Sequence, residues 1–116
     1  MKKLLLLLAV LLSTTVVRAQ NVTGSITGIV KDPSGSVVPN ARVVAVNTGT
    51  SATFSTTSGP EGAYTVRAIP IGLYDLSAEV AGFKRYETKG IRLQVNEVAR
   101  VDIALEVGQT VETVTV

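Results

Sequence analysis

The amino-acid sequence predicts an all-β fold, a β-sandwich of about seven short strands that follows a leader peptide. From residue 24 onward, apolar residues recur with a period of two, the period of a strand with one buried face. Turn residues separate these runs at intervals of roughly 8–12 residues, a spacing typical of sandwiches. No amphipathic helical pattern follows residue 19, so helices are not expected to cover a sheet.

The first three predicted strands are separated by recognisable turns. The first strand has one face formed by Ile26, Gly28 and Val30. A turn follows at residues 32–35, where proline and glycine supply the backbone angles that a turn needs. Residues 41–47 are expected to form the second strand. The Thr-rich residues 51–57 are expected to form a third strand, at a sheet edge.

Three glycines in the middle of the chain, Gly62, Gly72 and Gly82, are ten residues apart, and each is followed closely by an aromatic residue. Either a solenoid repeat or a meander of short strands produces this spacing. The flanking sequences differ, which favours the meander. Two strands are predicted here and are joined by a connection at residues 69–72. Their apolar faces are expected to carry Tyr64, Val66 and Ala68 in one strand and Tyr74, Leu76 and Ala78 in the other.

The last two predicted strands, residues 91–95 and 99–107, show strict alternation of apolar and polar side chains. Asn96 and Glu97 lie between them as a hairpin-type turn. Asp102 falls on the solvent-facing phase of the second strand. Across all strands, the predicted core consists of Ile26, Val30, Val43, Tyr64, Val66, Tyr74, Leu76, Leu93, Val101, Ile103 and Leu105.

Residues 1–19 have the pattern of a secretory signal peptide. Lys2 and Lys3 precede a leucine-rich run, and residues 17–19 have the small-x-small form that signal peptidase needs. The uncharged run at residues 4–17 rises roughly 21 Å as a helix, which is short of a hydrocarbon core of roughly 30 Å. Cleavage is therefore expected between Ala19 and Gln20. The predicted organisation is a signal peptide at 1–19, a linker at 20–23, the sandwich at 24–107 and an extended tail at 108–116.

Charge and cysteine content exclude two classes of protein. The formal net charge of +2 includes the basic residues of the leader, whose removal leaves 8 basic against 9 acidic residues. The mature chain therefore lacks the basic surface that binds nucleic acid, and no nucleic-acid partner is expected. The chain has no cysteine, so an exported domain must be held together by packing and not by disulfides.

The residues available for catalysis are few. Histidine and cysteine are absent, which removes the most common general base, the thiol nucleophile and most transition-metal sites. The carboxylates are scattered along the chain. Asp32 and Glu61 lie in turns that could approach one another, but a turn cap and a solvated acid explain them better. We therefore expect no enzyme activity, no cofactor and no metal site.

The aromatic residues supply the one candidate for ligand binding. Tyr64 and Tyr74 fall on apolar faces, where their hydroxyls would be hydrogen-bonded within the core. Tyr86 lies among charged residues and is expected to be exposed. Tyr86, Lys84 and Arg85 are therefore the candidate ligand-facing residues, and an oligosaccharide is the candidate ligand.

Several short motifs together resemble the carboxypeptidase regulatory-like domain over about residues 22–107. They are the runs at residues 24–30, 32–35, 38–43, 57–64, 69–74 and 81–83. The motif residues are Gly28, Asp32, Gly35, Pro39, Ala41, Gly62, Tyr64, Pro70, Gly72, Tyr74, Gly82 and Phe83. The resemblance implies a Greek-key sandwich of the transthyretin or prealbumin type, grouped with carbohydrate-binding-like folds. It implies structural roles in turns and core for these residues.

The resemblance also implies a function class. The domain is a non-catalytic accessory module in carboxypeptidases, and in bacteria it follows the signal peptide of Oar-like TonB-dependent outer-membrane receptors. Residues 107–116 are similar to the segment that leads into the plug of such receptors. The expected partners are then a downstream plug and barrel or a periplasmic protein, at the periplasm or outer membrane. A free carbohydrate-binding module and an accessory domain of a secreted peptidase are the alternatives.

Overall fold

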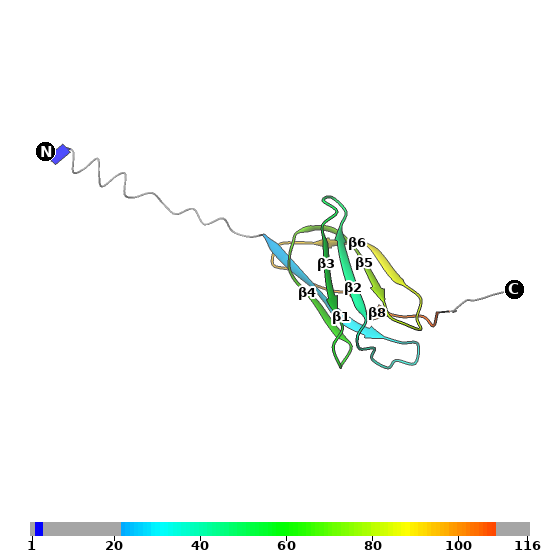
Figure 1. Cartoon of the computed structure of the whole chain (residues 1–116). Coiled ribbons are helices and arrows are strands. Elements are labelled where there is room, and N and C mark those ends of the chain that lie inside the picture. Colours follow the sequence, from blue (N-terminus) through cyan, green and yellow to red (C-terminus); the bar gives the residue numbers. More distant parts are fainter. Residues whose placement is uncertain (1, 4–21, 109–116) are drawn as a thin grey trace.

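The computed structural model describes residues 2–3 and 22–108 and confirms the all-β sandwich. Figure 1 shows its two sheets, with the chain entering at the start of β1 and leaving at the opposite end of the domain. The predicted cleavage site at Ala19 and Gln20 and most of the predicted tail lie outside the described residues. Within the described part, no helix is long and apolar enough to cross a membrane.

The first sheet is built around β1 (Thr23–Lys31) as its central strand. β4 (Ala63–Pro70) pairs antiparallel with one edge of β1. β7 (Val98–Arg100) and β8 (Ile103–Ala104) pair parallel with its other edge, one after the other. The first strand of the domain is thus hydrogen-bonded to the last.

The second sheet is antiparallel throughout and has the order β3-β2-β5-β6. Its strands are β3 (Thr53–Thr57), β2 (Arg42–Asn47), β5 (Gly72–Glu79) and β6 (Tyr86–Leu93). The Thr-rich strand β3 lies at an edge, as predicted. β6 begins at Tyr86 and not near Ile91, so the alternation seen in the sequence marked only its second half.

The predicted hairpin around Asn96 and Glu97 is wrong. β6 and β7 belong to different sheets, and residues 94–97 connect the two layers. Two backbone hydrogen bonds hold this connection on β1: the Asn96 amide donates to the Thr23 carbonyl at 2.9 Å, and the Ser25 amide donates to the Glu97 carbonyl at 2.8 Å. Alternation identifies the buried face of a strand but not its neighbour, and here the open edge of β1 accepts β7.

The predicted strand at 99–107 is interrupted, which gives eight strands in place of seven. The Val101 amide still donates to the Thr27 carbonyl at 2.8 Å, but the next contact with β1 comes from a side chain. Oδ1 of Asp102 accepts a hydrogen bond from the Ile29 amide at 3.0 Å. Asp102 is exposed, as predicted, yet its carboxylate replaces a backbone carbonyl in the ladder.

The predicted face of β4 is wrong at its end. Ala68 is exposed and has a φ of 53°, while Ile69, which was assigned to a connection, is 1% exposed. Gly24 pairs with Ile69 and Ile26 with Val66, so β4 has one residue more than β1 between these pairs. This is a β-bulge, and it shifts the alternation by one residue.

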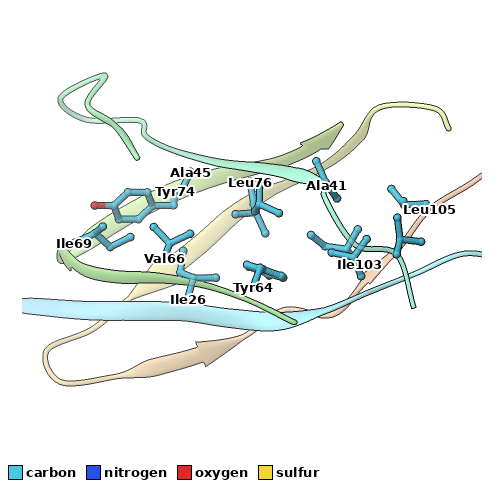
Figure 2. Packing of buried hydrophobic residues seen from close by; sticks show 14 of the residues in the cluster. Ile26, Ala41, Ala45, Tyr64, Val66, Ile69, Tyr74, Leu76, Ile103 and Leu105 are labelled. Atoms are coloured by element: carbon cyan, nitrogen blue, oxygen red, sulfur yellow. The ribbon is translucent and has the colours of Figure 1, made fainter. Parts of the chain in front are cut away.

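The core lies between the two sheets, as Figure 2 shows for Tyr74 and Leu76 facing Val66 and Ile26. Every predicted core residue is buried except Val101, which is half-buried against the cluster. Val95 and Val107 continue the apolar phase of their strands but are exposed. Five buried hydrophobic residues are absent from the predicted core: Val38, Ala41, Ala45, Ile69 and Ala78, of which Ala78 had been assigned to the apolar face of its strand.

Candidate functional site

The candidate residues Lys84, Arg85 and Tyr86 lie where the second sheet meets the last segment of the chain. The Lys84 amide donates to the Glu106 carbonyl at 2.8 Å, and Phe83 forms an isolated bridge with Val107. These contacts fix the start of β6 beside β8. Next to these contacts, a hollow lies between the start of β6 and β8.

This hollow has a volume of about 280 Å³. We call it the Tyr86 hollow; its lining residues are Lys84, Arg85, Tyr86, Glu87, Ala104 and Glu106. The structure therefore brings the three candidate residues together. It also adds Glu106, a carboxylate that the sequence analysis did not connect with them.

The charges of the Tyr86 hollow are paired with one another or with neighbours. Lys84 Nζ lies 3.7 Å from Glu106 Oε2. Arg85 lies 3.6 Å from both Glu79 Oε1 and Glu87 Oε1, through Nε and Nη2 respectively. All of these side chains are exposed, so each pair contributes little to stability. An incoming polar ligand would exchange these contacts for its own at low cost.

The expectation that Tyr86 is an exposed ring is wrong. Tyr86 is half-buried and packs against the core, and its hydroxyl accepts a hydrogen bond from Thr88 Oγ1. The cause is the early start of β6, which places Tyr86 on the inward phase of a strand. Its ring therefore offers less surface for stacking on a sugar than the sequence analysis expected.

The motif residues have structural roles. The hydroxyl of Tyr64 donates to the Val101 carbonyl, and burial raises the pKa of this phenol. The hydroxyl of Tyr74 donates to the Pro70 carbonyl at 2.6 Å. Among the remaining motif residues, Gly28 allows the Val101 backbone to approach closely, and Gly35, Gly62, Gly72 and Gly82 have positive φ. Ala41 is buried, Phe83 is half-buried and Pro39 is exposed.

The carboxylate of Asp32 is bound within its own turn. Oδ1 of Asp32 accepts hydrogen bonds from the Ser34 amide, the Ser34 hydroxyl and the Ser36 amide. The bond from the Ser34 hydroxyl is the main cause of a lowered pKa at Asp32. Asp32 therefore caps its own turn, as the sequence analysis predicted. Among residues 2–3 and 22–108, no group of three His, Cys, Asp or Glu side chains is placed to hold a metal ion.

A larger hollow, of about 480 Å³, was missed by the sequence analysis. It lies over the outer face of the first sheet, where Ser25, Thr27 and Thr65 contribute small hydroxyl side chains and Arg67 and Val98 contribute larger ones. The alternate hydroxyl residues of β1 are the signal that could have revealed it. Ala68 and Asn96, both with positive φ, also line it.

Comparison with solved structures shows the fold. The chain is similar to the TIE protein of Bacillus anthracis, with a TM-score of 0.63 and 21% identity over 74% of this chain and 17% of that one. It is similar to a protein of Bacteroides uniformis ATCC 8492 described as a proposed carbohydrate binding protein, with a TM-score of 0.57 and 20% identity over 72% of this chain and 41% of that one. In both cases the chain spans less than half of the larger protein.

Catechol 1,2-dioxygenase from Pseudomonas arvilla C-1 has a TM-score of 0.60 and 12% identity over 83% of this chain and 56% of that one. At this identity the likeness concerns the fold alone. No curated protein matches the chain. The carboxypeptidase regulatory-like domain, however, matches residues 25–106, which is most of the chain. The chain belongs to the carboxypeptidase regulatory-like domain family, and its fold is a two-sheet β-sandwich.

Proposed function

We propose that this module is the N-terminal, periplasmic extension of a TonB-dependent outer-membrane receptor. One observation carries the proposal: the chain enters and leaves the sandwich at opposite ends. Thr23, at the start of β1, pairs with Pro70 at the end of β4, whereas Val107 bridges Phe83 beyond the end of β5. Figure 1 shows the two exits far apart. This is the geometry of an in-line module between a leader and a following domain.

Three further observations support the proposal. The signal-peptide pattern at residues 1–19 predicts export. The motif residues have roles in turns and in the core, which suits a module whose function is to connect or to bind. In two structural neighbours this fold makes up 17% and 41% of a longer chain. A fold used in this way fits a module within a larger exported protein.

Fractionation of the native host tests the proposal. An antiserum raised against residues 24–107 is expected to detect a polypeptide much larger than this chain, in the outer-membrane fraction. The epitope should resist protease in intact cells and be digested once the outer membrane is permeabilised. Mass spectrometry should place the N-terminus of the processed protein at Gln20. A soluble periplasmic species of the size of this chain alone would contradict the proposal.

Carbohydrate binding is the second candidate function. The Bacteroides uniformis neighbour favours it, and the Tyr86 hollow supplies the polar side chains that would contact hydroxyl groups. Calorimetry against starch and cell-wall oligosaccharides tests it. Arg85→Ala should abolish any binding in the hollow. Lys89→Ala, which changes an exposed cation of β6 outside the hollow, should leave binding unchanged. Binding that persists in Arg85→Ala would place the sugar elsewhere.

A further inference from the structure

The two sheets of the sandwich have four edges, and three of these edges carry features that prevent pairing with another strand. An open edge offers unpaired N–H and C=O groups to any extended chain, and proteins protect it with charges, bulges, proline or very short strands. The edge at β4 has the bulge at Ala68, the exposed Arg67 and the terminal Pro70. The edge formed by β7 and β8 consists of strands of three and two residues.

The edge at β6 is protected in a different way. Its pairing with β5 contains a register shift, and Gly90 within it has a positive φ. It also carries three exposed charged residues, Glu87, Lys89 and Arg92. A second strand would therefore meet both an irregular backbone and charged side chains along this edge.

The fourth edge, formed by β3, has none of these features. The five residues Thr53–Thr57 include no charged residue, no proline and no glycine. Their pairing with β2 runs from Arg42–Thr57 to Val46–Thr53 without a register shift. Among the described strands, β2 alone pairs with β3, so the other side of β3 is open to a further strand. We call this open side the β3 edge.

The hydrogen bonds at the two ends of β3 show which of its backbone groups face away from β2. The Asn47 amide donates to the Ala52 carbonyl at 2.8 Å, and the Ser58 amide donates to the Ala41 carbonyl at 2.9 Å. In an antiparallel ladder, residues that bond to the neighbouring strand alternate with residues whose N–H and C=O groups face away from it. The residues of β3 that face away, all with exposed side chains, are Thr53, Ser55 and Thr57.

Buried polar side chains fix both ends of β3. Asn47, which is 6% exposed, accepts hydrogen bonds at Oδ1 from the Gly49 and Thr50 amides at 2.9 and 3.1 Å. Ser58, which is 2% exposed, donates its hydroxyl to the Val38 carbonyl at 2.8 Å. A strand that is held in this way loses little conformational entropy when another strand pairs with it. The β3 edge is therefore preorganised for pairing.

We propose that the β3 edge pairs with the β3 edge of a second copy of this chain, antiparallel, about a two-fold axis at Ser55. The residues that face away from β2 are symmetric about Ser55, so the edge is complementary to itself. Ser55 then lies opposite Ser55 of the second copy, and Thr53 lies opposite its Thr57. Each of these pairs exchanges two backbone hydrogen bonds, and the two four-stranded sheets become continuous. The inference does not rest on the proposed function.

The side chains on both faces of β3 suit this pairing. On the inner face, the half-buried Phe54 lies opposite Thr56 of the second copy. Aromatic residues opposite β-branched residues stabilise antiparallel sheets. On the outer face, the side chains that meet are the hydroxyls of Thr53, Ser55 and Thr57. These are small and uncharged, so they allow the two strands to approach.

The charges beside the β3 edge do not oppose the pairing. Arg42 lies opposite Thr57 in β2. In the two-fold arrangement the Arg42 residues of the two copies are three strand spacings apart, at least roughly 14 Å, which exceeds a Debye length of about 8 Å. The exposed charges on the neighbouring turn and strand, Glu61 and Arg67, have opposite signs. Repulsion between the copies is therefore weak.

Sedimentation equilibrium tests the proposal with the chain that begins at Gln20, which retains every described strand. The mean mass should rise from monomer toward dimer between about 10 µM and 1 mM, because one strand pair forms a small interface of the weakly binding class. Ser55→Lys places two ammonium groups opposite one another on the axis and should abolish the dimer. Gln94→Lys is the matched control, since it adds the same charge at an exposed position outside β3. It should leave the dimer unchanged.

Disulfide trapping tests the register of the two strands. The chain has no cysteine, so Ser55→Cys introduces a single thiol. In the proposed dimer the two thiols lie opposite one another, with Cα atoms roughly 5.5 Å apart, a distance that a disulfide spans. Oxidation by copper phenanthroline in air should therefore yield a covalent dimer. Thr53→Cys is the control, because its two copies are four residues apart along the paired strands, roughly 13 Å, and should not be linked.

Each other outcome overturns the proposal. A mean mass that stays at the monomer value up to about 1 mM would show that a second copy is not the partner of the β3 edge. A dimer that persists in Ser55→Lys would place the contact elsewhere on the molecule. Equal trapping of Ser55→Cys and Thr53→Cys would show a different register or non-specific association. Circular dichroism melts check that each variant is folded, and if Ser55→Lys does not fold, the two cysteine variants decide the question by themselves.

Discussion

The carbonyl oxygen of Val101 lies 1.9 Å from the position that a Cβ atom at Gly28 would occupy. The same carbonyl accepts the hydroxyl of Tyr64. The segment between β7 and β8 therefore packs directly on the backbone of β1, at the point where its strand pairing with β1 is interrupted. Glycine is required at position 28 because of this close approach, which a side chain of any size would prevent.

Gly28→Ala should destabilise the domain by about 1–3 kcal/mol or more, since the added methyl group meets backbone that cannot move aside. Chemical denaturation measures this loss of unfolding free energy. Gly59→Ala is the matched control, because the added Cβ would lie 3.9 Å from the Ala63 carbonyl oxygen, an ordinary contact. A similar loss in both variants would contradict the role assigned to the Val101 contact.

Tyr64→Phe should lower the unfolding free energy by about 1 kcal/mol, because the Val101 carbonyl loses a hydrogen bond. It should also change the alkaline stability. Burial raises the pKa of Tyr64 above its ordinary value of 10.0. The neutral phenol therefore stabilises the fold fully below that value, and the contribution is lost as pH rises through the raised pKa. Denaturation curves on both sides of the ordinary value should show a steeper alkaline decline in the parent than in Tyr64→Phe.

Substitution of Asp102 should separate its charge from its role as an acceptor. The hydrogen bond from the Ile29 amide is the main cause of its lowered pKa, so the carboxylate stabilises the fold above the ordinary value of 3.8. This contribution is lost as pH falls through the lowered pKa. Asp102→Asn retains an acceptor and Asp102→Ala does not. We expect Asp102→Ala to have a lower melting temperature than Asp102→Asn. In both variants the stability should depend less on pH in the acid range than it does in the parent. Equal melting of parent and Asp102→Ala would contradict this role.

Ile103→Ala and Leu105→Ala should each cost about 2–5 kcal/mol, the range for a buried aliphatic side chain truncated to alanine. Val101→Ala should cost less, since Val101 is half-buried. Val107→Ala, at an exposed position, should stay within about 0.5 kcal/mol of the parent. Thermal melts that rank Val101 above Ile103 would show that the strand is packed differently.

The buried faces of the strands could be predicted from sequence because burial follows the alternation of side chains. The partner of a strand could not, since β7 has the same alternation whether it pairs with β6 or with β1. The bulge at Ala68 was also hidden, because alanine gives no sign of a positive φ. In the candidate site, the nearness of Lys84, Arg85 and Tyr86 follows from their positions in the chain. The approach of Glu106 does not, because it depends on the long-range bridge between Phe83 and Val107.

The parallel pairing of β1 with the end of the domain has a consequence for the timing of folding. Ile29 and Asp102 are hydrogen-bonded although 73 residues separate them. One edge of the central strand β1 can pair with β4, but its other edge lacks its partners β7 and β8 until residue 104 has left the ribosome and, in an exported chain, the translocation channel. Closing so long a loop costs entropy before its contacts form, and topologies of this kind fold slowly. For a chain that is exported as proposed, we expect the domain to stay unfolded during translocation and to reach its native state only afterwards.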